Sequence, residues 1–215
     1  DIYFIILIAA LVGARALYVI ISFDSYKNNL IDVIKIWNGG LVFFGGFIAA
    51  AAAVLFFLKI KNINVWLAAD LISPGIALGH AVGRIGCLFA GCCYGRTCDL
   101  PIAVTFTHPQ SLAPLNVALH PTQLYMAGSN LILFLILIQV TRMKQFTGMV
   151  FLVYIMLYAL FRFINEFFRG DFRGNFFFDF LSVSQGIGLC IFVTALVLLV
   201  KLIRKNRLAT QNGRG

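Results

Sequence analysis

Unbroken apolar stretches, separated by short polar segments, run along almost the whole chain. Six of them are about 20 residues long: roughly residues 2–22, 38–58, 66–89, 122–141, 147–168 and 181–203. A run of this length crosses a bilayer as a helix, whereas the strands of a membrane barrel alternate apolar and polar positions. The pattern therefore predicts an all-α, polytopic membrane bundle of about six transmembrane helices. We expect a single membrane domain over residues 1–205 and a short basic tail over 206–215.

Basic residues are distributed unevenly between the two sides of these predicted spans. One side has nine of the 17 Lys and Arg residues and no acidic ones: Lys59, Lys61, Arg142, Lys144, Lys201, Arg204, Lys205, Arg207 and Arg214. On the other side, five basic residues are offset by five aspartates: Lys27, Lys35, Arg96, Arg169 and Arg173 against Asp24, Asp32, Asp99, Asp171 and Asp179. Because cytoplasmic loops carry the excess of Lys and Arg, we expect the first side and the C-terminus to be cytoplasmic. Six spans then place Asp1 on the same side.

The composition agrees with a membrane protein. Hydrophobic residues make up 61% of the chain and charged residues 12%, about half of the ~25% charge of a soluble domain. So low a share of charged residues is hard to reconcile with a soluble surface, and the composition excludes a disordered chain. The net charge of +9 is explained by the topology, so we expect no nucleic-acid partner.

When the charged residues assigned to the loops and the tail are set aside, five remain inside the predicted spans: Arg15, Asp70, Arg84, Arg162 and Glu166. Such residues are costly in lipid and mark functional sites, unless they extend from a helix end toward water. Arg162 and Arg84 lie roughly 20 and 27 Å along outward-running helices, and Arg15 also lies in the outer half of its span. We expect these arginines to meet at the outer leaflet and to bind an anion such as a phospholipid head group. Asp70, near the inner start of its helix, is expected to have a structural role.

The fifth predicted span carries a polar face. Tyr154, Tyr158, Arg162, Glu166 and Arg169 follow one another at intervals of four or three residues, so they share one side of a helix. Glu166 is placed to pair with Arg162 and to hold it in position. A self-neutralising pair is the simpler alternative, but it leaves Arg169 and both tyrosines unexplained.

The third predicted span has a polar face of its own. His80, Arg84 and Cys87 stand at i, i+4 and i+7 and share that face. A histidine at this spacing is more often a hydrogen-bonded packing residue than a ligand. A packing role for His80 therefore stays an alternative to substrate binding.

Two short motifs stand near span ends. Gly45 and Gly46 follow another glycine pair six residues earlier in the same stretch, which would permit close approach to another helix or to a lipid. The segment 120–125 has the sequence HPTQLY and contains His120, Gln123 and Tyr125. It enters the fourth span at the outer surface, with a proline at the helix start. Both motifs are candidates for substrate binding.

Four cysteines lie close together in the sequence, at Cys87, Cys92, Cys93 and Cys98, and Cys190 stands alone in the last span. Their spacing does not match the paired Cys-x2-Cys of a zinc ribbon. The segment also reaches an oxidising outer compartment. We therefore favour structural thiols or a disulfide over zinc ligation and predict no metal site.

Together these motifs resemble the prolipoprotein diacylglyceryl transferase family of bacterial inner-membrane enzymes. The shared motifs occur in the family's order over about residues 10 to 200: Gly39-Gly40 through Gly45-Gly46, Asp70 with Pro74, Gly83-Arg84-Ile85-Gly86, the segment 120–125, and Tyr158-x3-Arg162-x3-Glu166-x2-Arg169. Each motif is modest by itself, and the set is specific.

The resemblance implies a reaction and roles for residues. The family transfers the diacylglyceryl group of phosphatidylglycerol to the thiol of the lipobox cysteine of a prolipoprotein, the first step of lipoprotein maturation, and releases glycerol phosphate. Arg84 and Arg162 match its essential arginines and would bind the phosphate and stabilise its departure, while Glu166 orients Arg162. The predicted substrate-binding residues are Tyr158, Arg169, His120, Gln123, Tyr125, Gly45, Gly46, Arg15, His80 and Cys87. No cofactor is expected.

The chain departs from the family pattern at four points. Phe44 stands where many members have a histidine that is a candidate base for the thiol, Cys87 replaces an asparagine, and Met126 replaces a glutamate. The family also begins outside with one more helix, which we expect to be absent here. Without a base at Phe44, the charge of the arginines is expected to favour the thiolate, with His80 or Glu166 as lesser candidates for the base.

Two other functions stay open. A lipid or anion transporter would use the same arginines, but it would show midplane sites and repeated halves, and neither is visible in the sequence. A catalytically inactive relative that binds lipid would account for Phe44 and for the expected absence of the first helix.

Overall fold

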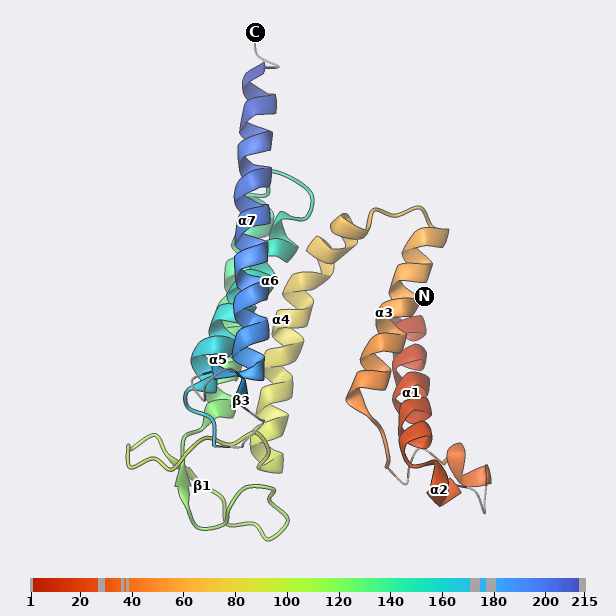
Figure 1. The fold of residues 1–215 in the computed structure, drawn as a ribbon, viewed down its shortest axis with the longest axis vertical. Coiled ribbons are helices and arrows are strands. Elements are labelled where there is room, and N and C mark those ends of the chain that lie inside the picture. The colour runs from red at the N-terminus through yellow and green to blue at the C-terminus, as the bar shows by residue number, and fades with distance from the viewer. Residues whose placement is uncertain are drawn as a thin grey trace. The chain divides into compact units, whose positions relative to one another are not determined.

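The computed structural model describes residues 2–26, 30–35, 37, 39–170, 175–176 and 181–212 (Figure 1). Its helices are α1 Ile2–Ile21, α2 Phe23–Tyr26, the 3-10 helix η1 Leu30–Val33, α3 Phe43–Ile60, α4 Val65–Ala90, α5 Thr122–Arg142, α6 Met149–Glu166 and α7 Val183–Asn212. The short strands β1 Val104–Thr105 and β2 Ala118–Leu119 pair antiparallel, as do β3 Asn175–Phe176 and β4 Leu181–Ser182. Several charged residues used to predict the topology lie outside the described residues: Asp1, Lys27, Asp171, Arg173, Asp179, Arg214, and the side chains of Asp24 and Arg207.

The predicted helical membrane fold is confirmed. Within the described residues, α1, α4, α5, α6 and α7 are long and apolar enough to cross a membrane. The shorter apolar helix α3 coincides with the remaining predicted stretch. The six apolar stretches of the sequence therefore correspond to six helices.

The second predicted span begins later than the sequence suggests. Gly39 and Gly40 have φ angles of +81° and +76°, in the left-handed region that glycine enters without steric cost. As a result α3 begins only at Phe43. The interpretation of two glycine pairs within one apolar helix is therefore wrong, because only Gly45 and Gly46 lie in α3.

The chain divides into two compact units, Asp1–Ala68 and Ala69–Gly215. In the first unit, α1 packs on α3 where glycines approach closely. A Cβ on Gly45 would lie 2.3 Å from the carbonyl oxygen of Gly13, and a Cβ on Gly13 would lie 2.3 Å from the Cβ of Ala49. Neither position has room for a side chain, so the predicted close approach to another helix is confirmed.

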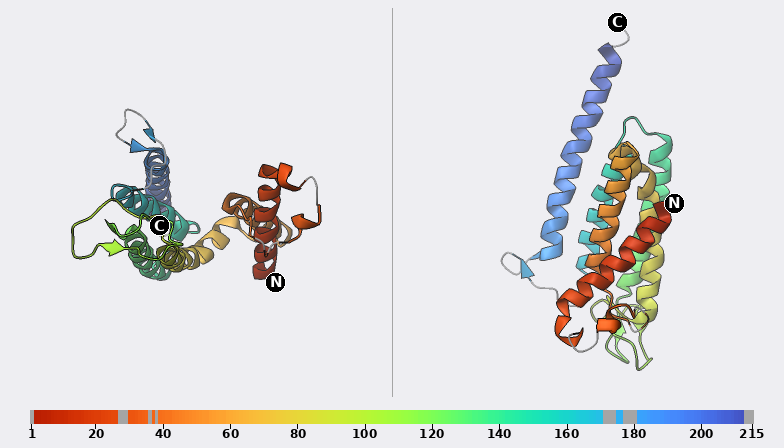
Figure 2. Two further views of the ribbon diagram at one scale, coloured as in Figure 1. Left: turned by 90° about the horizontal axis from the view of Figure 1, so that it is seen from below. Right: turned by 90° about the vertical axis from the view of Figure 1, so that its right-hand side faces the viewer.

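In the second unit, α5, α6 and α7 lie side by side around an apolar core (Figures 1 and 2). The core residues are buried or nearly so and come from four helices: Ala77, Leu133, Leu137, Val150, Leu152, Val153, Tyr154 and Leu199. α4 contributes Ala77 to this core, so the middle of α4 contacts the same bundle.

Asp70 joins the start of α6 to α4. Its carboxylate accepts hydrogen bonds from the backbone N–H groups of Gly148 (2.7 Å) and Phe151 (2.9 Å) and forms an ion pair with Lys144 at 2.9 Å. The first N–H groups of a helix have no partner within the helix, and a carboxylate placed there also interacts favourably with the helix dipole. Asp70 is 2% exposed, so the structural role predicted for it is confirmed.

Replacing Asp70 by Ala is expected to lower the free energy of unfolding by about 3 kcal/mol, because a buried ion-pair partner is lost and two helix N–H groups lose their acceptor. Thermal unfolding in detergent measures the change. Asp32 pairs with Lys35 at 2.6 Å, with both side chains more than a third exposed, so Asp32→Ala is the matched control and should cost less than about 1 kcal/mol. Equal losses in the two variants would contradict the role of Asp70.

Replacing Gly45 by Ala is expected to lower the free energy of unfolding by about 1–3 kcal/mol, since the new methyl group overlaps the backbone of α1. A Cβ added to Gly79, in the middle of α4, would meet no atom of another element within 4 Å, so Gly79→Ala should be neutral or stabilising by up to about 1 kcal/mol. The thermal midpoints of the two variants test this, and a Gly45→Ala midpoint at or above wild type would show that α1 and α3 do not pack in this way.

Candidate active site

Two contacts fix the register of α4 against α6. Near the first turns of α4 and α6, the carboxylate of Asp70 accepts a hydrogen bond from the backbone N–H of Gly148. Further along, the rings of His80 and Tyr158 lie 5.3 Å apart between centroids. His80 follows Asp70 by ten residues and Tyr158 follows Gly148 by ten residues (80 − 70 and 158 − 148). The two helices therefore run in the same direction and in step.

This register places two arginines at the same level. Arg84 follows His80 by one helical turn, and Arg162 follows Tyr158 by one helical turn. Since each residue advances a helix by about 1.5 Å, both arginines lie about 6 Å beyond the His80–Tyr158 contact. The His80–Tyr158 contact, which the sequence alone did not show, thus puts Arg84 and Arg162 at similar heights on their helices. The expected meeting of Arg15, Arg84 and Arg162 stays a prediction.

Arg162 is held by a carboxylate and a serine. It forms an ion pair with Glu166, one turn further along α6, and donates to the hydroxyl of Ser184 at 3.4 Å. Ser184 in turn donates to Glu166 at 2.6 Å, and Arg169 lies 3.7 Å from the same carboxylate. The predicted Arg162–Glu166 pairing is confirmed. Glu166 therefore fixes the orientation of one guanidinium and also contacts a second one.

Within the part of the chain that the structure describes, Arg84 differs from Arg162 because no residue binds its guanidinium donors. The side chain is half-buried, and among the described residues it has no hydrogen-bond or ion-pair partner. An arginine whose charge is not already paired is suited to bind an anionic ligand. The pair thus combines one positioned guanidinium with one available guanidinium.

The serine that contacts Arg162 is positioned by the first turn of α7. Ser182 accepts a hydrogen bond from the N–H of Gln185 (3.2 Å), while Gln185 accepts one from the N–H of Ser182 (2.9 Å). This reciprocal arrangement is a capping box, and it places Ser184 beside Glu166. Ser184 was not predicted from the sequence, although the Ser-x-x-Gln pattern before an apolar run was the signal that could have located it.

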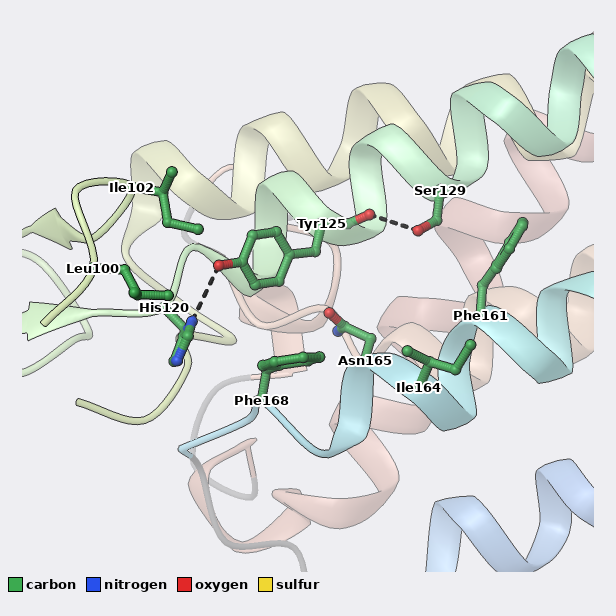
Figure 3. A pocket seen from close by; sticks show the side chains of 9 residues that line it. All are labelled: Leu100, Ile102, His120, Tyr125, Ser129, Phe161, Ile164, Asn165 and Phe168. Atoms are coloured by element: carbon green, nitrogen blue, oxygen red, sulfur yellow. Dashed lines mark hydrogen bonds between the residues drawn. The ribbon is translucent and has the colours of Figure 1, made fainter. Parts of the chain in front are cut away.

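A second group of predicted residues lines a pocket of about 350 Å³ (Figure 3). His120 Nδ1 lies 3.1 Å from the hydroxyl of Tyr125, and Phe168 packs against both rings at centroid distances of 5.4 and 5.7 Å. The remaining lining residues are mostly apolar: Leu100, Ile102, Ser129, Phe161, Ile164 and Asn165. An apolar cavity with a few polar groups is typical of a small-molecule or lipid site.

Asn165 is a polar group of this pocket that was not predicted from the sequence. It is 5% exposed, and its Oδ1 has no hydrogen-bond partner. Its side chain points toward the cavity between Tyr125 and Phe168 (Figure 3). A buried amide without a partner is costly in a fold and suits hydrogen bonding to a ligand.

Gln123 does not line this pocket, and its side chain binds the loop after α4 instead. Its side chain is 1% exposed and donates to the carbonyl of Cys92 at 2.8 Å. Its neighbour Thr122 donates to the carbonyl of Cys93 at 2.7 Å. The start of α5 therefore determines the position of the cysteine-containing loop.

All five cysteines lie in the described part of the chain and are free thiols. Cys87 ends the polar face of α4 and lies near Cys92 and Cys93. Burial, together with a hydrogen bond to Cys87 and the neighbouring thiols, raises the pKa of Cys92 to about 12. Cys92 is therefore a thiol at neutral pH in this state and a weak nucleophile.

The remaining predicted site residues, Arg15, Gly45 and Gly46, belong to the first unit. Arg15 donates five hydrogen bonds, all to backbone carbonyls between Asp32 and Gly40, at 2.6–3.2 Å. Its guanidinium also lies over the rings of Tyr18 and Tyr26. Arg15 therefore organises the segment between α1 and α3.

The fold and these contacts define a multi-pass helical membrane protein with arginines and a carboxylate among its spans. The sequence model of the prolipoprotein diacylglyceryl transferase family matches residues 1–201. The chain is 39% identical over 183 residues to the phosphatidylglycerol–prolipoprotein diacylglyceryl transferase of Clostridium tetani, covering 85% of this chain and 72% of that protein. It is 36% identical over 193 residues to the protein of the same name from Finegoldia magna, covering 89% and 73%. The chain belongs to the prolipoprotein diacylglyceryl transferase family.

Replacing Asn165 by Leu is expected to leave the thermal midpoint within a few degrees of wild type, because the lost Oδ1 has no partner in the fold. If the amide binds a ligand in the pocket, kcat/KM of the reaction proposed below should fall about tenfold. Asn130 is the matched control, since it is 1% exposed with an unpartnered Oδ1 but does not line the pocket. Equal activity of the Asn165→Leu and Asn130→Leu variants would exclude Asn165 from substrate binding.

Proposed function

We propose that this protein transfers the diacylglyceryl group of phosphatidylglycerol to the thiol of the lipobox cysteine of a prolipoprotein. The observation that carries the proposal is the register of α4 and α6, which sets Arg84 and Arg162 at one level beyond the His80–Tyr158 contact. Family membership and the names of the relatives supply the chemistry. The proposed transfer uses no cofactor.

In the proposed reaction, the thiolate sulfur attacks the glycerol carbon that carries the phosphate ester. A carbon–sulfur bond forms, the carbon–oxygen bond breaks, and glycerol phosphate leaves with the electron pair. Arg84 binds the phosphate through its available donors, and Arg162, oriented by Glu166 and Ser184, binds it from α6. Guanidinium groups fixed in a low-dielectric site stabilise the charge that develops on the leaving group.

The thiol must lose its proton before it attacks. The positive field of the two arginines increases the thiolate fraction, as a neighbouring cation does for other reactive thiols. His80 is the better of the two candidate bases, because its Nδ1 is buried without a partner and its ring contacts Tyr158. Both oxygens of Glu166 already accept hydrogen bonds from Arg162 and Ser184.

The pocket between α5 and α6 is assigned to an apolar part of a substrate. On α6, Phe161 and Ile164 of this pocket occupy a different side of the helix from Arg162 and Glu166. Phe168 joins them from the turn just after α6. A lipid chain or the apolar part of the leader peptide therefore has a place beside the phosphate site without occupying it. His120 and Tyr125 line this place, together with Asn165.

The charges support a location in the bacterial cytoplasmic membrane with the C-terminus in the cytoplasm. Arg142 ends α5, Lys144 lies in the connection between α5 and α6, and the end of α7 is also basic. The Lys and Arg excess marks the cytoplasmic side. Since α6 begins at that side and runs away from it, Arg162 and Arg84 belong to the outer half of the membrane, where a secreted prolipoprotein is accessible. In this proposal residues 1–205 act as one membrane domain.

Replacing Arg84 or Arg162 by Ala is expected to lower transfer at least about 100-fold, because each loses a charge that stabilises the leaving phosphate. The assay uses the full chain in phosphatidylglycerol vesicles with a lipobox peptide and detects a mass increase of one diacylglyceryl group on cysteine. Arg142→Ala is the control, since Arg142 is exposed at the far end of α5, and it should keep wild-type activity.

Three outcomes would overturn the proposal. Near-normal transfer by Arg84→Ala or Arg162→Ala would exclude the phosphate scheme. Lipid movement across the vesicle without peptide modification would favour a transporter. Lipid binding with neither movement nor modification by the wild-type chain would favour an inactive relative.

A further inference from the structure

Three thiols meet at the outer end of α4. The Sγ atoms of Cys87, Cys92 and Cys93 all lie within 4.8 Å of one another, and each residue is half-buried. Cys87 belongs to the last turn of α4, and the other two lie in the loop that follows it. The transfer step proposed above assigns no chemical role to these thiols.

The backbone turns the two loop thiols toward the same point. Consecutive side chains of an extended segment point to opposite sides, but Cys93 has a φ of +59° and Gly91 a φ of +68°. The left-handed conformation at these positions reverses the chain, and the N–H of Cys92 donates to the carbonyl of Cys87 at 3.1 Å. A left-handed cysteine is uncommon and is maintained only by surrounding contacts.

Buried side chains of α5 hold the loop in this shape. Gln123 and Thr122 are each 1% exposed and bind the carbonyls of Cys92 and Cys93 at 2.8 and 2.7 Å. The three thiols are therefore brought together by contacts that do not depend on a bond between the sulfurs. A site whose ligands are already positioned loses less entropy on binding.

We propose that Cys87, Cys92 and Cys93 form a three-thiolate site for a soft, closed-shell metal ion, of which Zn²⁺ is the probe of choice. A Zn–S bond of about 2.3 Å in tetrahedral geometry implies sulfurs about 3.8 Å apart, so small side-chain rotations bring the observed cluster to that geometry. A metal ion can be ligated by all three sulfurs, whereas a disulfide pairs only two of the cysteines and leaves the third as a free thiol. The bound ion joins the end of α4 to the loop held by α5, one turn beyond Arg84.

The test measures metal binding by the full chain, purified in detergent under reducing conditions and equilibrated with Zn²⁺. We expect one Zn²⁺ per chain for the wild type and for Cys190→Ser, whose thiol is exposed on α7. Competition with a chelator should show at least a tenfold loss of affinity for Cys87→Ser and for Cys93→Ser. Bound Cd²⁺ should show a thiolate-to-metal charge-transfer band that both variants lose.

A second measurement on the wild-type chain needs no variant and so does not depend on folding of the variants. Zn²⁺ should slow alkylation of Cys87, Cys92 and Cys93 at least tenfold and leave the rate at Cys190 unchanged, as followed by peptide mass spectrometry. Unchanged alkylation at the three cysteines overturns the proposal. A disulfide among them in the unreduced protein, or Zn²⁺ binding equal to wild type in the two variants, overturns it as well. None of these outcomes depends on transferase activity.

Discussion

The carboxylate of Asp70 sets the position of α4 along α6, and the second unit depends on that position. It binds two N–H groups at the start of α6 and the ammonium of Lys144, while nearly excluded from solvent. A buried carboxylate needs hydrogen-bond and ion-pair partners to offset its lost hydration. Sliding α4 along α6 would break these bonds, so the helices are held in a single register.

The chemistry of the site follows from this register. Ten residues beyond Asp70, His80 meets Tyr158, and one turn further the two helices present Arg84 and Arg162. Glu166 and the capped start of α7 then determine how Arg162 points. Charged groups in a membrane are costly to place. The contacts of Asp70 at one end of α4 and α6 set the heights of Arg84 and Arg162, the proposed phosphate ligands, further along the same helices.

The helices and the contacts within one helix could be predicted from the sequence, because both depend on the spacing of residues close together in the chain. The lengths of the apolar runs predicted the helices, and the four-residue interval predicted the Arg162–Glu166 pair. Partners distant in sequence were not predictable. Asp70 binds Gly148 across 78 residues, and Ser184 reaches Glu166 from another helix. The left-handed Gly39 and Gly40 also escaped prediction, because an apolar run does not show where a helix begins.

The central claim is that Arg84 and Arg162 act on one phosphate from two helices in fixed register. A double-mutant cycle tests it directly, by measuring kcat/KM for transfer from phosphatidylglycerol in wild type, Arg84→Ala, Arg162→Ala and the double variant. If both guanidinium groups hold the same phosphate, the losses in kcat/KM are strongly non-additive. The kcat/KM of the double variant should then be within about tenfold of that of the less active single variant. Losses that multiply fully in the double variant would show that the two arginines act independently and would contradict the account.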